Sequence, residues 1–303
     1  MRLLAISDLH LGHRVNREAL PTLGEYPDDW LIVAGDVGEG PAHLSLALEA
    51  LVPRFARVIW TPGNHDLWCP VTETDRTRGV ARYDELVDIC RRFGVLTPED
   101  PYVAWPEDPD TFIVPLFLLY DYTFRPPEVA IADAVAWARD RGIVCGDEQM
   151  LSPSPFPTRE AWCAARCADA EARLTALPPA SRTVLVNHWP LRYDLARPPR
   201  IPRFSIWCGT ARTEDWGRRF QARSVISGHL HMRTTLTRDG TRYEEVSLGY
   251  PRDWRLERGL DWYLRVILPE DAPGRDRFIP PWDPFRRGRT PIAESRISPD
   301  DEI

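Results

Sequence analysis

The sequence predicts an α/β fold with a cluster of polar side chains at one edge of a sheet. Apolar runs alternate with amphipathic segments along the first half of the chain, which is typical of βαβ units. Five apolar runs lead directly into phrases that contain Asp, Asn or His. Only seven histidines occur in 303 residues, and five of them fall in these phrases. The strand pattern and the polar phrases therefore predict the fold and a site together.

The strands are predicted from apolar runs bounded by polar or turn residues. In chain order these runs are residues 2–7, 30–34, 57–60, 111–120, 183–186 and 224–227. Pro115 predicts a bulge or an edge in the fourth run. Further strands are predicted at 232–237, 241–248 and 262–268. Asp239-Gly240 is a hairpin turn signal between the first two of these, so we expect the chain to end in antiparallel strands.

The helices are predicted from apolar positions at helical spacing, with start and stop signals at their ends. The predicted segments are 41–56, 80–93, 128–141 and 159–177. Pro41 stands in the first turn of the first helix, where its missing N–H costs nothing. Gly94 and Gly142 follow the second and third helices as C-caps, and Pro178-Pro179 stops the fourth.

The domain organisation follows from length and composition. We expect one domain over residues 1–268, with loop insertions near 121–158 and 191–221 that border the mouth of the site. Residues 269–303 are rich in Pro, Arg and Asp, which predicts a tail that lies on the surface or is disordered. None of the six cysteines forms a Cys-x-x-Cys pair, so a structural zinc site is not expected.

The charge and the N-terminal segment limit where the protein acts. A net charge of −7 argues against a general coat on nucleic acid or on anionic membranes. No run of 18 apolar residues predicts a membrane span. The apolar run 2–7 enters Asp8 directly, which leaves no room for a signal peptide and its cleavage site. We therefore expect a cytoplasmic protein.

Seven residues of the polar phrases carry side chains that bind divalent metals. They are Asp8, His10, Asp36, Asn64, His188, His229 and His231. The Asp-x-His and His-x-His phrases each place two donors two positions apart, so an extended backbone would point both to one side. Asp36 can bridge two metals through its two carboxylate oxygens, and Asn64 offers a carbonyl oxygen. This mixture of donors predicts two divalent ions, with Mn or Fe favoured and Zn or Co as alternatives.

The order of these phrases resembles the calcineurin-like metallophosphoesterases. The phrases are Asp8-Leu9-His10, Gly35-Asp36, Gly63-Asn64-His65-Asp66, His188 and Gly228-His229-Leu230-His231. The resemblance covers roughly residues 2–250 and implies a four-layer α/β/β/α sandwich with a dinuclear metal centre between two mixed sheets. It implies one metal held by Asp8, His10, Asp36 and His231, and another held by Asp36, Asn64, His188 and His229.

The resemblance also implies a reaction. A hydroxide that bridges two metals about 3.5–4 Å apart would attack phosphorus in line with the leaving oxygen. His65 would protonate that oxygen, and Asp66 would orient the ring of His65. The phrase Ser247-Leu248-Gly249-Tyr250-Pro251 also occurs in similar form in bacterial members; we expect it to close the sheet behind the metals and assign it no catalytic role.

Residues that would recognise the substrate are harder to predict. Our candidates for substrate contact are His13, Arg192, Arg203 and Arg212. Trp68 and Trp189 each follow a site histidine closely, and packing is the favoured role over stacking on substrate. The leading hypothesis is hydrolysis of a phosphomonoester or phosphodiester in a small phosphorylated molecule, with nucleotides among the candidates. The alternatives are a DNA or RNA nuclease and a non-catalytic scaffold of the same fold; the oligomeric state is left open.

Overall fold

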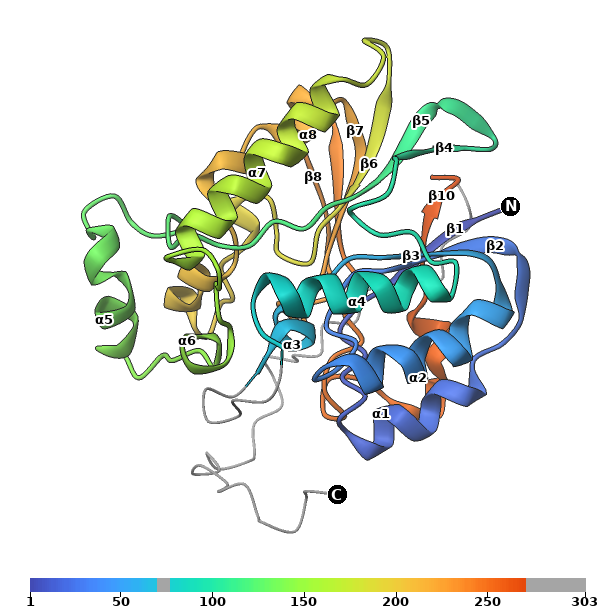
Figure 1. Cartoon of the computed structure of the whole chain (residues 1–303), viewed down its shortest axis with the longest axis horizontal. Coiled ribbons are helices and arrows are strands. Elements are labelled where there is room, and N and C mark those ends of the chain that lie inside the picture. Colours follow the sequence, from blue (N-terminus) through green and yellow to red (C-terminus); the bar gives the residue numbers. More distant parts are fainter. Residues whose placement is uncertain (70–76, 271–303) are drawn as a thin grey trace.

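The computed structural model describes residues 1–69 and 77–270 and arranges their strands in two sheets (Figure 1). The first sheet has the order β10 (Arg265–Leu268), β1 (Leu3–Ile6), β2 (Tyr26–Val33) and β3 (Phe55–Trp60). The second sheet has the order β4 (Val103–Trp105), β5 (Asp108–Pro115), β6 (Arg182–Val186), β7 (Ala222–Ser227), β9 (Thr241–Glu245) and β8 (Thr235–Arg238). Both sheets are mixed, because parallel inner strands carry antiparallel strands at an edge.

The α-helices pack outside the two sheets. They are α1 (Arg14–Ala19), α2 (Pro41–Leu51), α3 (Asn64–Leu67), α4 (Val80–Arg92), α5 (Ala134–Arg139), α6 (Asp147–Met150), α7 (Arg159–Thr175) and α8 (Trp216–Arg219). Short 3-10 helices are Leu20–Thr22, Val52–Arg54, Ile131–Asp133, Tyr193–Leu195, Pro202–Trp207, Ala211–Thr213, Leu256–Arg258 and Leu260–Tyr263. In Figure 1, α1, α2 and α4 lie beside the first sheet, and α7 and α8 lie beside the second.

Alternation along the strands divides the core into layers. Leu3 and Ala5 of β1 face a cluster with Ile32, Ile113 and other residues from both sheets. The intervening residues of β1 belong instead to the larger cluster that includes the helices. Because successive side chains of a strand point to opposite faces, one cluster lies between the sheets and the other lies under the helices. The predicted four-layer α/β/β/α sandwich is confirmed.

Several predicted element bounds differ from the structure, and each difference has a local reason. The helix predicted over 41–56 ends at Leu51, because β3 already begins at Phe55. The helix predicted over 128–141 is reduced to α5 and one preceding 3-10 turn. The strand predicted over 111–120 ends at Pro115. Beyond it, the side-chain amide of Asn187 makes both hydrogen bonds to the backbone of Leu118, in place of bonds from a neighbouring strand.

The C-terminal strands follow the prediction only in part. β8 and β9 form the antiparallel hairpin, with positive φ at both Asp239 and Gly240 as a two-residue turn requires. However, β9 pairs in parallel with β7, and β10 crosses to the first sheet, where it pairs antiparallel with β1. Residues 271–303 of the predicted tail lie outside the described residues. No helix within residues 1–69 and 77–270 is both long and apolar enough to cross a membrane.

Candidate active site

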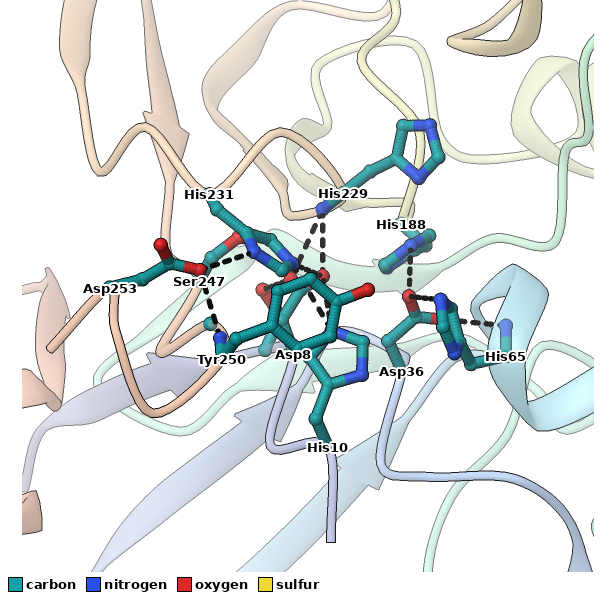
Figure 2. A network of polar contacts seen from close by, with 12 residues as sticks. Asp8, His10, Asp36, His65, His188, His229, His231, Ser247, Tyr250 and Asp253 are labelled. Atoms are coloured by element: carbon teal, nitrogen blue, oxygen red, sulfur yellow. Dashed lines mark hydrogen bonds and ion pairs between the residues drawn. The ribbon is translucent and has the colours of Figure 1, made fainter. Parts of the chain in front are cut away.

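The candidate metal ligands come from strand ends of both sheets and meet in one place (Figure 2). Asp8, Asp36 and Asn64 follow β1, β2 and β3 of the first sheet. His188 and His229 follow β6 and β7 of the second sheet. Parallel strands deliver their carboxyl ends to one edge of a sheet, and here the edges of two sheets are neighbours, since Ser7 bridges to Ser247.

The backbone at the ligands is turned and not extended, which corrects the expectation for the Asp-x-His and His-x-His phrases. The φ angles are positive at Asp8 (54°), His10 (43°), Asp36 (51°), His229 (73°) and His231 (51°). Each such residue costs roughly 1–2 kcal/mol relative to ordinary backbone. The strands end at Ile6 and Ser227, before the ligands, so the pleat of the strand does not set their directions.

The first group of donors consists of Asp8, His10 and His231. Nε2 of His231 lies 3.0 Å from Oδ1 of Asp8 and 3.1 Å from Nε2 of His10. Nδ1 of His231 lies 2.9 Å from Oδ2 of Asp253, so Nδ1 donates to that carboxylate and Nε2 is the ring nitrogen that faces Asp8 and His10. Two imidazole nitrogens and a carboxylate oxygen therefore converge, an arrangement that a metal cation between them would stabilise.

The other carboxylate oxygen of Asp8 is already fully engaged. Oδ2 accepts hydrogen bonds from the hydroxyls of Ser7 (2.5 Å) and Ser247 (2.7 Å) and from the backbone N–H of His229 (3.1 Å). Asp8 is fully buried, so these donors replace water around the carboxylate. They leave Oδ1 as the oxygen that faces the donors of His10 and His231.

The second group of donors consists of Asp36, His188, His229 and Asn64. His188 donates from Nδ1 to the carbonyl of Ala34 at 2.9 Å, so Nε2 is the ring nitrogen that faces Oδ2 of Asp36, at 3.4 Å. Within the described residues this buried Nε2 has no hydrogen-bond partner. Burial lowers the pKa of His188, but the carboxylates of Asp36 and Asp8 outweigh it and raise that pKa to about 9. The surroundings therefore favour a positive charge at this position.

Asp36 connects the second group to His10 of the first group. Its side chain belongs to a set of possible metal donors with His10 and His65, and to another with His188 and His229. Gly63 makes the close approach possible, because a Cβ at Gly63 would collide with the Asp36 carboxylate. The residues present thus fit the binding of divalent metal, and this fit rests on clustered donors with unpartnered buried nitrogens and not on sequence order.

His65 lies on α3 beside this cluster. Its ring stacks on Trp68, with 3.6 Å between the ring centroids, and its edge contacts His10 at 4.7 Å. Nε2 of His65 lies 4.0 Å from Oδ2 of Asp36. Burial lowers the pKa of His65, but Asp36 and Glu39 outweigh it and raise that pKa. A histidine that holds its proton next to the metal ligands fits the predicted role of an acid.

Asp66 does not orient the ring of His65, which corrects the prediction. Among the residues that the structure describes, its carboxylate accepts hydrogen bonds from backbone N–H groups only, at Asp36 (2.9 Å), Val37 (3.0 Å), Gly38 (3.4 Å) and Gly63 (2.8 Å). The reason is its position: Asp66 is the third residue of α3, where an acidic side chain reaches back to the helix N-cap. Asp66 therefore holds together the two loops that carry Asp36 and Asn64.

Glu39 has the contact with His65 that the sequence analysis predicts for Asp66. Its Oε1 lies 3.2 Å from Nδ1 of His65. Glu39 lies in the loop between β2 and α2, where no motif of the sequence marks it. With Nδ1 engaged by Glu39, Nε2 is the ring nitrogen of His65 that faces the metal ligands.

Asp147 is a second residue that sequence reasoning missed. It is fully buried at the start of α6, inside the predicted insertion 121–158. Its Oδ1 accepts hydrogen bonds from Nδ2 of Asn64 (2.9 Å) and from Nε1 of Trp68 (2.7 Å). The first bond turns the carbonyl oxygen of Asn64 toward the cluster, where it lies 3.1 Å from Nδ1 of His229. One carboxylate thus orients a metal donor and the aromatic ring under His65.

Replacing Asp147 by leucine is expected to weaken metal binding by about 10–100-fold, the usual effect of losing an outer hydrogen-bond partner of a metal ligand. Two buried donors would also lose their acceptor, at about 1–3 kcal/mol each. The measurements are a calorimetric titration with Mn²⁺ and thermal unfolding of the metal-free protein. Asp140→Leu, at an exposed position after α5, is the control. Unchanged Mn²⁺ affinity in Asp147→Leu would mean that Asn64 needs no such support.

The residues predicted to contact the substrate have different surroundings. His13 is exposed, and its ring lies 5.3 Å from that of Tyr250, which borders the cluster. Arg192 pairs with Asp194 and Asp239, Arg203 lies over the ring of Trp137, and Arg212 lies 3.5 Å from the Asp121 carboxylate. The contacts described for the three guanidinium groups are thus with carboxylates and an aromatic ring, and none of them is with a candidate metal ligand.

Two aromatic residues near the cluster have different surroundings. Trp189 is fully buried against His188 and core aromatics, as the favoured packing role predicts. Tyr250 was expected behind the site but lies directly against it, stacked on His10 with 4.4 Å between ring centroids. Burial, followed by the carboxylates of Asp36 and Asp8, raises the pKa of Tyr250.

Comparison with known proteins agrees with this site. A model of the family described as calcineurin-like phosphoesterase matches residues 1–233. The acyl-carrier-protein phosphodiesterase PptH of Mycobacterium tuberculosis is 49% identical over 278 residues, which cover 90% of this chain and 85% of that protein. The crystal structure of the phosphopantetheinyl hydrolase PptH from the same organism matches with a TM-score of 0.84 at 48% identity, over 90% of this chain and 98% of that chain. The chain therefore belongs to the calcineurin-like phosphoesterase family, and it is a metal-dependent hydrolase of phosphoester bonds.

Proposed function

We propose that the chain is a phosphodiesterase that removes the phosphopantetheinyl group from an acyl carrier protein. The observation that carries this proposal is the 49% identity to a phosphodiesterase of that description over 90% of the chain. The sequence predicts a small phosphorylated molecule as the substrate. In this proposal the group that the phosphate carries is small, but it is attached to a protein. The partner is accordingly an acyl carrier protein.

Two divalent metals would occupy the cluster, with Mn or Fe favoured by the donor set. Asp8, His10, Asp36 and His231 would hold one metal, and Asp36, Asn64, His188 and His229 would hold the other. When bound, two such ions polarise a phosphate and lower the pKa of water, so that a nucleophile is available at neutral pH. The unpartnered Nε2 of His188 and the convergent donors around His231 support this assignment.

His65 would supply the proton that the reaction consumes. Hydrolysis breaks the bond between phosphorus and the oxygen of the carrier protein, and that oxygen must leave as a hydroxyl. Nε2 of His65 is free to donate, because Glu39 engages Nδ1 and Trp68 supports the face of the ring. The phosphate would stay with the pantetheinyl group, and water would provide its new oxygen.

The direct test incubates the Mn²⁺-loaded protein with a carrier protein that bears the phosphopantetheinyl group. Intact-mass spectrometry should show loss of that group from the carrier and release of phosphopantetheine. Chelation of the metal should stop the reaction. Bis-p-nitrophenyl phosphate serves as a diester without a carrier: if it is cleaved while the carrier stays intact, the carrier-protein assignment is wrong and the hydrolase remains. A labelled oligonucleotide in the same buffer tests the nuclease alternative.

A further inference from the structure

We infer that the hydroxyl of Tyr250 contacts the substrate and donates a hydrogen bond to a non-bridging oxygen of the phosphate. The inference rests on the proposed function, because that function places a phosphodiester over the candidate metal ligands. It assigns a catalytic contact to a residue of the phrase 247–251, for which the sequence suggested only a supporting role.

The ring of Tyr250 lies across the metal ligands. It stacks on His10 at 4.4 Å between centroids, and it meets His231 edge-on at 4.8 Å and His65 at 6.5 Å. Figure 2 shows the ring over this cluster with its hydroxyl directed toward the side of Asp36. The side chain is therefore next to ligands of the first group and to the proposed acid, on a face of the site that His13 also borders.

The loop that carries Tyr250 is tied to the metal ligands. Oδ2 of Asp253 accepts hydrogen bonds from Nδ1 of His231 and from the backbone N–H of Tyr250, both at 2.9 Å. Gly249 has a φ of +91° and lies against Asp253, where a Cβ would collide with the carboxylate. Its N–H donates to the carbonyl of Asp8 at 3.0 Å. The same carboxylate thus orients a metal ligand and sets the position of the tyrosine.

The hydroxyl of Tyr250 is free to serve a ligand. The structure gives it no hydrogen-bond partner among residues 1–69 and 77–270, whereas the hydroxyls of Tyr83 and Tyr122 donate to Glu99 and Glu148. Tyr102 and Tyr120 also have unpartnered hydroxyls, but those oxygens are sealed in the interior, and that of Tyr250 is not among the sealed atoms. A phenol is a neutral donor at pH 7, since its ordinary pKa is about 10.

The chemistry gives this donor a use. Negative charge gathers on the non-bridging oxygens of the phosphate as the nucleophile adds, and fixed donors at those oxygens lower the barrier. The packing alternative holds that Tyr250 only supports the rings of His10 and His231. Phenylalanine separates the two roles, because it keeps the ring and removes the hydroxyl.

The experiment compares Tyr250→Phe with Tyr102→Phe, which removes an unpartnered hydroxyl beside the start of β4. For Tyr250→Phe we expect kcat/KM on bis-p-nitrophenyl phosphate to fall by about 10–100-fold, as for loss of one hydrogen bond to a charged group. Calorimetry on the Mn²⁺-loaded proteins should show a similar loss of affinity for inorganic phosphate. Metal content should stay equal to that of the parent protein, and Tyr102→Phe should change none of these quantities.

Two results would overturn the inference. If Tyr250→Phe keeps both its kcat/KM and its phosphate affinity, the hydroxyl does not touch the phosphate. If the variant loses metal instead, Tyr250 supports the ligands and does not contact the substrate. Both measurements use bis-p-nitrophenyl phosphate or inorganic phosphate and no carrier protein. Failure of the proposed function is seen in a different experiment, in which the parent enzyme would leave the loaded carrier protein intact.

Discussion

Replacing Asp36 by asparagine is expected to lower kcat/KM on a phosphodiester by at least about a thousandfold. An amide offers one neutral oxygen where the carboxylate offers two charged ones, so it cannot join two metals. The fold should survive, because asparagine tolerates the positive φ of this position and its oxygen can still accept from the N–H of His65. The loss therefore reports on the metals and not on unfolding.

Metal content by mass spectrometry is the measurement that decides this prediction. We expect two Mn²⁺ per chain in the parent protein and at most one in Asp36→Asn. Asp110→Asn, which removes an exposed carboxylate on β5, is the matched control and should change neither metal content nor turnover. Two tightly bound ions in Asp36→Asn would show that Asp36 is not the shared ligand.

Replacing His65 by alanine is expected to lower turnover of the carrier-protein substrate by about 10²–10⁴-fold while both metals stay bound. The reason is that an alkoxide leaving group needs a proton. A p-nitrophenolate leaves without one, so the same variant should lose much less activity on bis-p-nitrophenyl phosphate. This dependence on the leaving group distinguishes an acid from a residue that only binds phosphate.

Steady-state kinetics on the two substrates provide the comparison, and Glu39→Gln provides the control. Glutamine at position 39 can still accept a hydrogen bond from Nδ1 of His65, so we expect an intermediate loss with the same preference for the better leaving group. An equal loss on both substrates in His65→Ala, or loss of metal from that variant, would contradict the role of His65 as the acid.

The parts of the site that could be predicted from the sequence are those with a local signal. Asp8, Asp36 and His188 each follow an apolar run, so the strand that positions them is visible in the adjacent residues. Five such phrases in a fixed order then also identified the family. The family in turn predicted the two-sheet sandwich, which no periodicity in this chain would have given.

The parts that could not be predicted depend on contacts between distant segments. Asp147 meets Asn64 across 83 residues, and nothing near Asp147 marks it among the 45 acidic residues of the chain. Asp66 does not take its expected role because α3 begins at Asn64, which turns Asp66 back toward the N-terminus of that helix, and Glu39 contacts the ring of His65 instead. Tyr250 lies against the candidate metal ligands because the chain turns at Gly249, which has a positive φ. The direction of the chain after such a turn cannot be read from the sequence.

The strain at the ligands could not be predicted either. A strand that ends one or two residues before a ligand no longer controls where that ligand points. The positive φ at Asp8 and His231 instead follows from the need to bring donors of two sheets to one point. Tertiary packing and hydrogen bonds to Ser247 and Asp253 overcome that local cost.

The pairing of Asp8 with His231 has a consequence for how the protein is made. These residues are 223 positions apart, and the hydrogen bonds that hold Asp8 come from Ser247 as well. A growing chain on the ribosome therefore lacks a complete set of candidate ligands until synthesis has passed His231, which follows β7. We therefore expect the full set to bind metal only after the segments that carry Asp8 and His231 have both been synthesised and have met.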